Sequence, residues 1–197
     1  MARWGLVSLL CTLLVLYSVS LIVPEVQALE QGDRVNKTLI ADAIRLVREA
    51  AVDDRPLVVY YLNGVSGNLL FLGLQEVVQA ALGREDIRVV MPYALPLRQA
   101  LDEQFEFLPQ VTISHEEIRV VNAARPPQVL AAVYYDSSAI RTGLRIRNGS
   151  LYTLEVVEAD EVRHNLLRFV IRYARPAGTR VVFLLFERGR LVRHDVV

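Results

Sequence analysis

Residues 56–82 read PLVVYYLNGVSGNLLFLGLQEVVQAAL. The apolar and aromatic run at 57–62 lies between a proline and an Asn-Gly pair, which is typical of a strand buried on both faces of a sheet. After the glycine-bearing turn, apolar residues recur at helical spacing, at Leu70, Leu74, Val77, Val78 and Ala81. A further apolar run at 87–91 predicts a second strand, parallel to the first across a right-handed crossover. The sequence therefore predicts an α/β core.

An apolar segment occupies residues 5–23, between Arg3 and Glu25. Its length is sufficient to cross a bilayer as a hydrophobic helix, which favours a membrane anchor. The short residues that end at Ala28 instead resemble the end of a cleavable signal peptide, so residues 1–28 are interpreted as either a signal peptide or an anchor. Both alternatives predict an extracytoplasmic protein, whether periplasmic, lumenal or secreted, because the basic residue resists translocation.

The cysteine content and the net charge of the chain exclude several classes of function. Cys11 is the single cysteine and lies in the apolar segment, so the globular part has no thiol for disulfides, catalysis or metal binding. The chain has 22 basic and 22 acidic residues, and this balance gives no overall electrostatic footprint for nucleic acid. We therefore expect no nucleic-acid partner.

Further elements are expected on both sides of the central unit. Apolar residues on one face between 36 and 52 predict an amphipathic helix ahead of the first strand. Beyond the second strand, the sequence predicts a short helix at 95–104, strands at 107–113 and 118–121, and a helix from 126 to about 135.

Read as β-α-β-α-β-β-α over residues 57–135, this order resembles a thioredoxin-like domain, a mixed sheet flanked by helices. Residues 63–67 stand where that family carries its Cys-x-x-Cys, and the stretch around Pro109 resembles the one that holds its cis-proline. Both cysteines are absent, so the resemblance implies no redox activity. It implies instead a surface that holds peptides or partner proteins beside Pro109. In a competing register, residues 140–152 and the helix after them resemble the hairpin and last helix of the same fold.

The C-terminal part is predicted to be a ββαββ extension. Asn148-Gly149 predicts a hairpin with a type I′ turn, because both residues accept positive φ. A helix is expected from Asp160 to about Arg175, and two strands at 181–186 and 191–194 end the chain. The apolar stripe of the expected helix comprises Val162, Leu166, Phe169, Val170 and Tyr173.

The predicted organisation has three parts: residues 1–28, a thioredoxin-like α/β domain at 29–135, and the extension or second subdomain at 136–197. Residues 136–197 carry 11 arginines against 7 acidic residues, a net charge of +4, while 30–135 carry 10 basic against 14 acidic residues, a net of −4. The two halves are expected either to attract each other or to let the second half face an acidic partner.

Catalytic and metal-binding signals are weak. Ser66 follows a strand as a hydrolase nucleophile does, but the second glycine comes one position too early for G-x-S-x-G. The three histidines, His115, His164 and His194, are far apart in sequence and lack metal-ligand spacing. We expect neither a cofactor nor a metal.

These patterns favour a non-catalytic, exported and membrane-tethered protein that acts as a protein-binding or accessory scaffold subunit of a membrane assembly. Its terminal strand pair is expected to extend a partner's sheet by edge pairing. The candidate binding residues are Asn63, Gly64, Ser66, Gly67, Asn68 and Pro109. The alternatives are a small hydrolase or transferase working from residues 63–68, and an exported small-ligand-binding protein cleaved after Ala28.

Overall fold

The computed structural model describes residues 34, 36–66, 69–96, 108–122, 130–131, 139–187 and 190–194. Thr38–Val197 form one compact unit, separate from Met1–Lys37, and the fold below is that of the larger unit. The predicted signal peptide or anchor lies outside the described residues. The fold is mixed α/β and consists mostly of strands.

The central sheet has four strands in the order β12-β11-β1-β3. β1 (Leu57–Leu62) pairs in parallel with β11 (Arg180–Glu187) and with β3 (Ile87–Val90). β12 (Arg190–His194) pairs antiparallel to β11 and forms one edge. All six residues of β1 are buried, as expected for a strand covered on both faces.

A second sheet has five antiparallel strands in the order β5-β6-β10-β9-β8. Its strands are β5 (Gln110–Ile113), β6 (Glu117–Val121), β8 (Arg145–Asn148), β9 (Tyr152–Asp160) and β10 (Asn165–Tyr173). A small third sheet consists of β2 (Gly64–Ser66), β4 (Tyr93–Pro96) and β7 (Leu130–Ala131).

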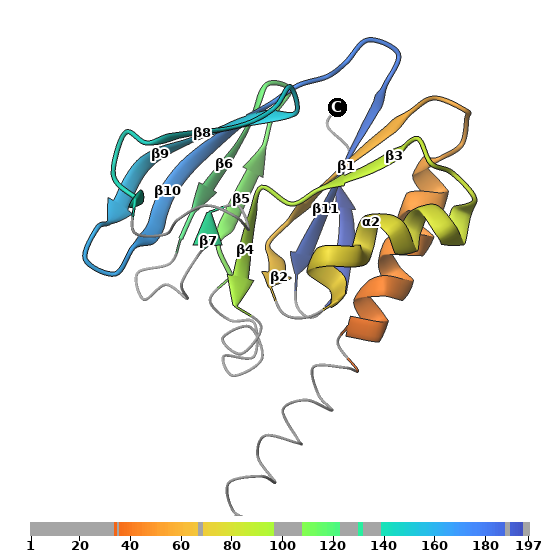
Figure 1. Ribbon diagram of the computed structural model, residues 1–197, viewed down its shortest axis with the longest axis horizontal. Helices are drawn as coiled ribbons and strands as arrows, with labels where there is room; N and C mark the ends of the chain where they lie inside the picture. The colour runs from red at the N-terminus through yellow and green to blue at the C-terminus, as the bar shows by residue number, and fades with distance from the viewer. Residues whose placement is uncertain are drawn as a thin grey trace, which may run out of the picture. The chain divides into compact units, whose positions relative to one another are not determined.

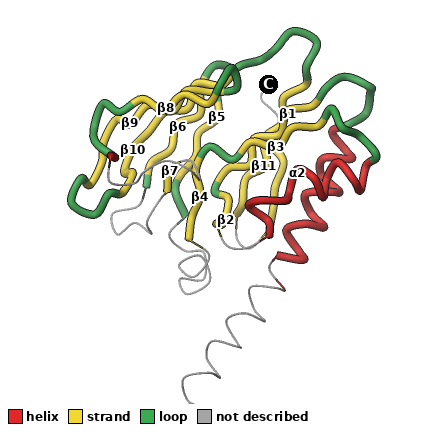
Figure 2. Tube along the Cα trace, viewed as in Figure 1, coloured by secondary structure: helices red, strands yellow, loops and turns green. Residues whose placement is uncertain are grey.

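The helices cover one face of the four-stranded sheet and the five-stranded sheet lies on its other side (Figures 1 and 2). Residues 38–50 are helical and bury one face, made of Leu39, Ala43, Leu46, Val47 and Ala50. α2 (Leu69–Leu82) is the crossover between β1 and β3 and buries Leu74 and Val78. Such a stripe on each helix is what packing against a sheet requires.

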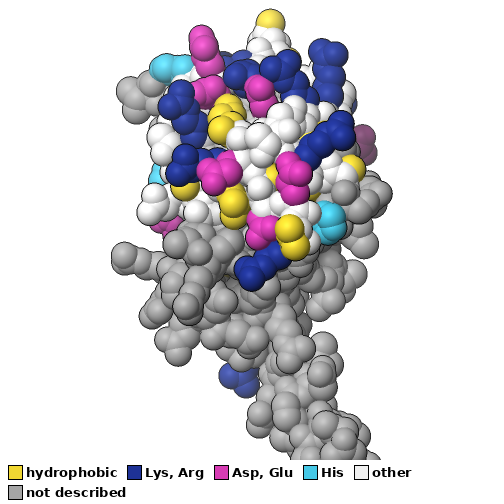
Figure 3. Space-filling view, turned by 90° about the vertical axis from the view of Figure 1, so that its left-hand side faces the viewer, with side chains coloured by type: hydrophobic (Ala, Val, Ile, Leu, Met, Phe, Trp, Pro, Cys, Tyr) yellow, Lys and Arg dark blue, Asp and Glu magenta, His cyan; other side chains and the backbone are white. Residues whose placement is uncertain are grey.

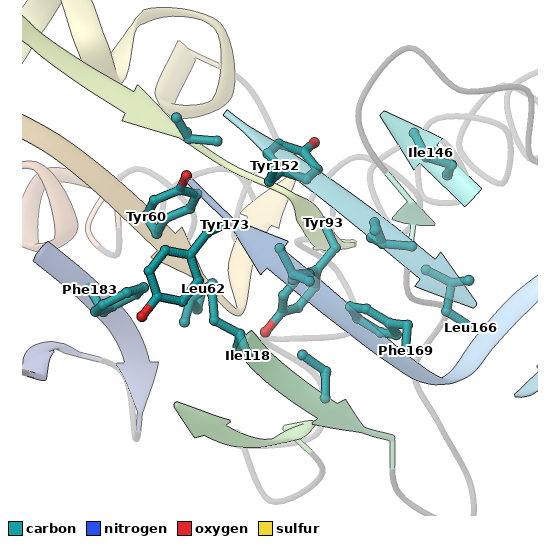
Figure 4. Close-up of a cluster of buried hydrophobic side chains, with 14 of the residues drawn as sticks. Tyr60, Leu62, Tyr93, Ile118, Ile146, Tyr152, Leu166, Phe169, Tyr173 and Phe183 are labelled. Atoms are coloured by element: carbon teal, nitrogen blue, oxygen red, sulfur yellow. The ribbon is translucent and has the colours of Figure 1, made fainter. Parts of the chain in front are cut away.

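The main core lies between the two large sheets (Figure 4). Tyr60 of β1 stacks on Phe183 of β11, and Tyr173 of β10 meets the edge of the same ring. Buried tyrosines need a partner for the hydroxyl. The Tyr60 hydroxyl donates to the Leu151 carbonyl at 2.7 Å, and that of Tyr173 donates to the Ser114 carbonyl at 2.6 Å.

Several sequence-based predictions are confirmed. The structure has the buried strand at 57–62, the helix after it, the parallel second strand and the helix ahead of the first strand. β5, β6 and the two terminal strands also fall where they were expected. These elements have strong local patterns of apolar residues.

The predicted helix from Asp160 to Arg175 is wrong, because residues 165–173 form strand β10. The pairing of β10 with β9 shifts in register between Leu166 and Phe169, which marks a β-bulge. The extra residue lets Leu166 and Phe169 both be buried although they are three apart. The bulge therefore gives the strand the spacing of a helix. The described part of the C-terminal extension is not ββαββ but contains the five strands β8 to β12.

Two other predicted helices are wrong where the structure describes them. Residues 93–96 form β4, which pairs with β2 and β7, so the predicted helix at 95–104 does not begin at residue 95. Residues 130–131 form β7 within the range predicted to be helical. The remaining residues of both ranges, 97–104, 126–129 and 132–135, lie outside the described residues.

The predicted hairpin at Asn148-Gly149 exists, but its type I′ turn is wrong. Asn148 pairs with Tyr152, so three residues form the loop. Gly149 has a φ of +50°, whereas Asn148 is the last residue of β8 and is not among the residues with positive φ. The Leu151 N–H donates to the Asn148 carbonyl at 3.0 Å and closes the wider loop.

Strands from both sides of the predicted boundary at residue 135 are neighbours in one sheet. β11 pairs with β1 along the whole length of β1, from Leu57 opposite Arg180 to Leu62 opposite Leu185. The end of the chain therefore completes the sheet that its first strand begins.

Candidate functional site

The predicted loop begins at the carboxyl end of β1. Asn63 follows β1 directly, has a φ of +52° and is buried. Gly64 starts β2, and a β-carbon there would lie 2.7 Å from the Met91 sulfur, so this position favours glycine. Ser66 ends β2, and its side chain is not described; Gly67 and Asn68 lie outside the described residues.

A buried hydrogen-bond network brings two of the predicted residues together. The Asn63 side-chain amide donates to the Pro109 carbonyl at 3.1 Å. The Asn63 backbone N–H donates to the Tyr93 hydroxyl at 3.1 Å, and that hydroxyl donates to the Asn63 side-chain oxygen at 2.8 Å. The network ties the end of β1 to β4 and to the residue before β5.

This network consists of neutral groups that bond one another. Tyr93 is fully buried, and burial raises the pKa of its hydroxyl far above the ordinary value, so the group stays protonated at neutral pH. Pro109 is also buried, and the Leu108–Pro109 peptide bond is trans, unlike the cis-proline of the thioredoxin family. The three residues fix the shape of the chain at this point and do not present a reactive atom.

The edges of the four-stranded sheet differ in how they are covered. At β3, the Gln75 side-chain oxygen accepts the Val89 N–H at 3.2 Å, and the Gln79 amide donates to the Ile87 carbonyl at 2.8 Å. Both glutamines come from α2, one turn apart. Side chains of α2 therefore occupy the main-chain groups by which β3 would accept another strand.

The opposite edge is formed by β12. The Leu191 N–H donates to an Asp42 carboxylate oxygen at 3.4 Å, which is longer than the usual range for such a bond. Because β12 lies antiparallel to β11, alternate residues direct their main-chain groups to the same side. The amides of Leu191 and Arg193 are therefore both directed away from β11.

A groove of about 360 Å³ lies beside this edge. It is lined by Glu49, Ala50, Val52, Arg180, Val181, Val182 and Arg193. Residues 180–182 belong to the part of β11 that precedes its first described pair with β12, Phe183 with His194. The Arg180 guanidinium donates to the Ala50 carbonyl at 2.6 Å, and Val52 is 70% exposed. The groove thus combines four apolar residues with Glu49 and two arginines at the end of a sheet edge.

The outer face of the five-stranded sheet carries acidic and basic side chains side by side (Figure 3). Glu155 lies 2.6 Å from Arg172 and 2.9 Å from Arg145, on neighbouring strands. Glu117 lies 2.6 Å from Arg119 and 4.0 Å from Arg172. These charges alternate across β6, β10, β9 and β8 and neutralise one another.

The three histidines come from different elements. His115 lies in the turn before β6, His164 lies in the turn between β9 and β10, and His194 ends β12 with its ring 3.6 Å from Glu187. No group of three His, Cys, Asp or Glu side chains that could hold a metal ion occurs within the described ranges.

Sequence reasoning missed the residues that distinguish the two sheet edges. Gln75 and Gln79 are four apart and, with Glu76, are the polar side chains of α2, and this spacing was the available signal. Asp42 gave no comparable signal, because its contact with Leu191 joins residues 149 positions apart.

Among the described residues, no helix is both long enough and apolar enough to span a membrane. The sheet orders give no identification of a thioredoxin-like fold. Comparison with protein-family models, curated proteins and solved structures finds no match to this chain.

Proposed function

We propose that this protein binds another protein by main-chain pairing along β12 and acts as a non-catalytic accessory or scaffold subunit. The observation that carries the proposal is the difference between the two edges of the central sheet. Two side chains of α2 bond the β3 edge at 3.2 and 2.8 Å, whereas at the β12 edge the described contact is the longer 3.4 Å bond from Leu191 to Asp42, and a groove lies beside the strand. Strand addition at an exposed edge supplies affinity through the backbone and specificity through alternate side chains.

The setting that we propose for this binding rests on the sequence. The apolar segment at 5–23 tethers the protein to a membrane, and the folded part lies on the extracytoplasmic side. The partner then belongs to the same membrane assembly. The thioredoxin-like classification and the binding role of the loop at 63–68 and Pro109 stay predictions.

Site-specific photocrosslinking in native membranes tests the proposal. A photoreactive benzoylphenylalanine replaces Val192, which is on β12 and 40% exposed. Val157, on β9 and 51% exposed, provides the matched control on the other sheet. We expect a discrete heteromeric adduct from position 192 and none from position 157. Equal adducts from both positions, or none from position 192, would refute the proposal.

A proline substitution tests the main-chain part of the proposal. Arg193→Pro removes an amide directed away from β11, which an edge strand tolerates. The unfolding midpoint is measured alongside, and we expect the folded variant to lose the adduct from position 192. A folded variant that still gives the full adduct would show that β12 does not pair with the partner.

A further inference from the structure

We infer that Asn148 is a modification site, where the chain converts its own side-chain amide to a carboxylate through a succinimide ring closed by the Gly149 backbone nitrogen. The chain contains two Asn-Gly pairs, Asn63-Gly64 and Asn148-Gly149, and the dipeptide alone gives both the same chemistry. The structure distinguishes them, because it buries the first pair and exposes the second. The inference concerns the five-stranded sheet and goes beyond the proposed function, which concerns β12.

The reaction needs a backbone nitrogen that can reach the side-chain carbonyl carbon of the preceding asparagine. This nitrogen loses its proton to a base in the solvent and forms a bond to that carbon. The bond from the carbon to the amide nitrogen then breaks, and ammonia leaves with a proton from solvent. Water opens the ring at either carbonyl and gives aspartate or isoaspartate. Glycine favours ring closure, because no side chain hinders the close approach of its backbone.

The loop after β8 leaves this approach open. Asn148, Gly149 and Ser150 are all exposed, and a β-carbon at Gly149 would have no atom within 4 Å. The Leu151 N–H donates to the Asn148 carbonyl and closes the turn, whereas the Gly149 N–H makes no hydrogen bond within the described part of the chain. The attacking nitrogen can therefore lose its proton without breaking a hydrogen bond of the fold.

The Asn148 side chain has a contact of its own, and this contact does not prevent the reaction. Burial raises the pKa of the Tyr152 hydroxyl, and a hydrogen bond with the Asn148 side chain lowers it. A hydrogen bond that favours the ionised hydroxyl is one that the amide N–H donates. The contact therefore uses the nitrogen that leaves as ammonia and not the carbonyl carbon that is attacked.

The pair at Asn63 is protected by the buried network. Asn63 is 2% exposed, its amide donates to the Pro109 carbonyl at 3.1 Å, and its side-chain oxygen accepts from the Tyr93 hydroxyl at 2.8 Å. Gly64 is buried as well. Ring closure would take the side chain away from both partners, so it requires a local opening of the fold, which costs free energy.

The product changes the hairpin in two ways. A carboxylate appears beside Arg147, an exposed residue of β8. Isoaspartate also directs the main chain through the former side chain and lengthens it just before the turn. Within this turn, the Leu151 carbonyl accepts hydrogen bonds from the Tyr60 hydroxyl at 2.7 Å and from the Ala174 N–H at 2.8 Å. We therefore expect the isoaspartate form to be less stable than the unmodified chain.

Peptide mapping by mass spectrometry tests the inference on the full chain in detergent micelles, incubated at mildly alkaline pH. The peptides of both pairs are scored for the mass gained when an amide becomes a carboxyl, and electron-transfer fragmentation distinguishes isoaspartate from aspartate. We expect the Asn148 peptide to convert at least about tenfold faster than the Asn63 peptide, because the buried pair reacts only after local opening. Isoaspartate should be among the products at position 148.

Unfolding provides the matched control. In denaturant both pairs are exposed and should convert at similar rates, which would show that the fold separates them. Asn148→Gln replaces the reacting side chain by a longer amide, whose ring would be larger and harder to close, and this variant should not convert at position 148. Its unfolding midpoint should stay constant during the incubation, while that of the unsubstituted chain falls.

Three outcomes would overturn the inference. The first is equal conversion of the two pairs in the folded chain. The second is a folded chain in which Asn148 stays unmodified while the unfolded chain reacts, since the hairpin would then protect this residue too. The third is conversion to aspartate without isoaspartate, because opening of a succinimide ring gives both products.

Discussion

Asn63 and Pro109 are 46 positions apart, and the side-chain amide of Asn63 donates a 3.1 Å hydrogen bond to the Pro109 carbonyl. Tyr93 completes the network through two further bonds to Asn63. The end of the central strand is therefore held by contacts to two segments that follow much later in the chain.

Asn63→Ala should destabilise the protein by about 2–4 kcal/mol, because it leaves buried partners at Tyr93 and Pro109 unsatisfied and keeps a positive φ at a residue with a β-carbon. Asn63→Gly should cost less, since glycine accepts this φ. Denaturant unfolding measures both variants. If the alanine and glycine variants lose the same free energy of unfolding, backbone strain contributes nothing at this position.

The cover over the β3 edge can be tested through Gln75. Gln75→Ala removes the acceptor of the Val89 N–H and should cost about 1 kcal/mol of folding free energy. Hydrogen exchange at the Val89 amide should become faster, while amides of the opposite β12 edge stay unchanged. Gln110→Ala, at an exposed glutamine of β5, is the control. Unchanged exchange at Val89 would show that the side chain does not protect this edge.

The free energy of unfolding should fall at high pH because of the buried Tyr60 hydroxyl. Burial raises the pKa of Tyr60 to about 12, above the value of about 10 for an unfolded tyrosine. The folded state favours the protonated hydroxyl, so its contribution is complete below pH 10 and is lost as the pH rises toward 12. Unfolding free energies of the protein and of Tyr60→Phe, measured between pH 8 and 12, should converge at the upper end. Parallel curves would contradict the prediction.

Glu155 should titrate at low pH. Hydrogen bonds from Arg172 first, and then from Arg145, hold the pKa of its carboxyl below the usual range. The ion pairs therefore contribute above the unfolded pKa and are lost as the pH falls through the folded one. An NMR titration of the side-chain carboxyl should give a lowered pKa, and Arg172→Gln should move it back toward the ordinary value. A titration that the substitution leaves unchanged would show that Arg172 is not the cause.

Much of the α/β core was predictable from local pattern. The run at 57–62 is apolar throughout and became the buried β1, and the helical spacing after it became α2. Of the residues predicted for the candidate site, Asn63 and Pro109 belong to the hydrogen-bond network of the structure. The third member, Tyr93, gave no signal, because an aromatic residue in an apolar stretch is usually just core.

The sequence by itself determined which segments are apolar and at what period, and this was sufficient for β1, α2, β3 and the terminal strand pair. Only the tertiary structure decided that residues 165–173 form a strand, that β11 lies beside β1, and that α2 covers the β3 edge. The physical reason is that periodicity records burial and not the partner that provides it. At β10, a bulge made strand burial look helical, and only pairing with β9 and β6 distinguishes the two.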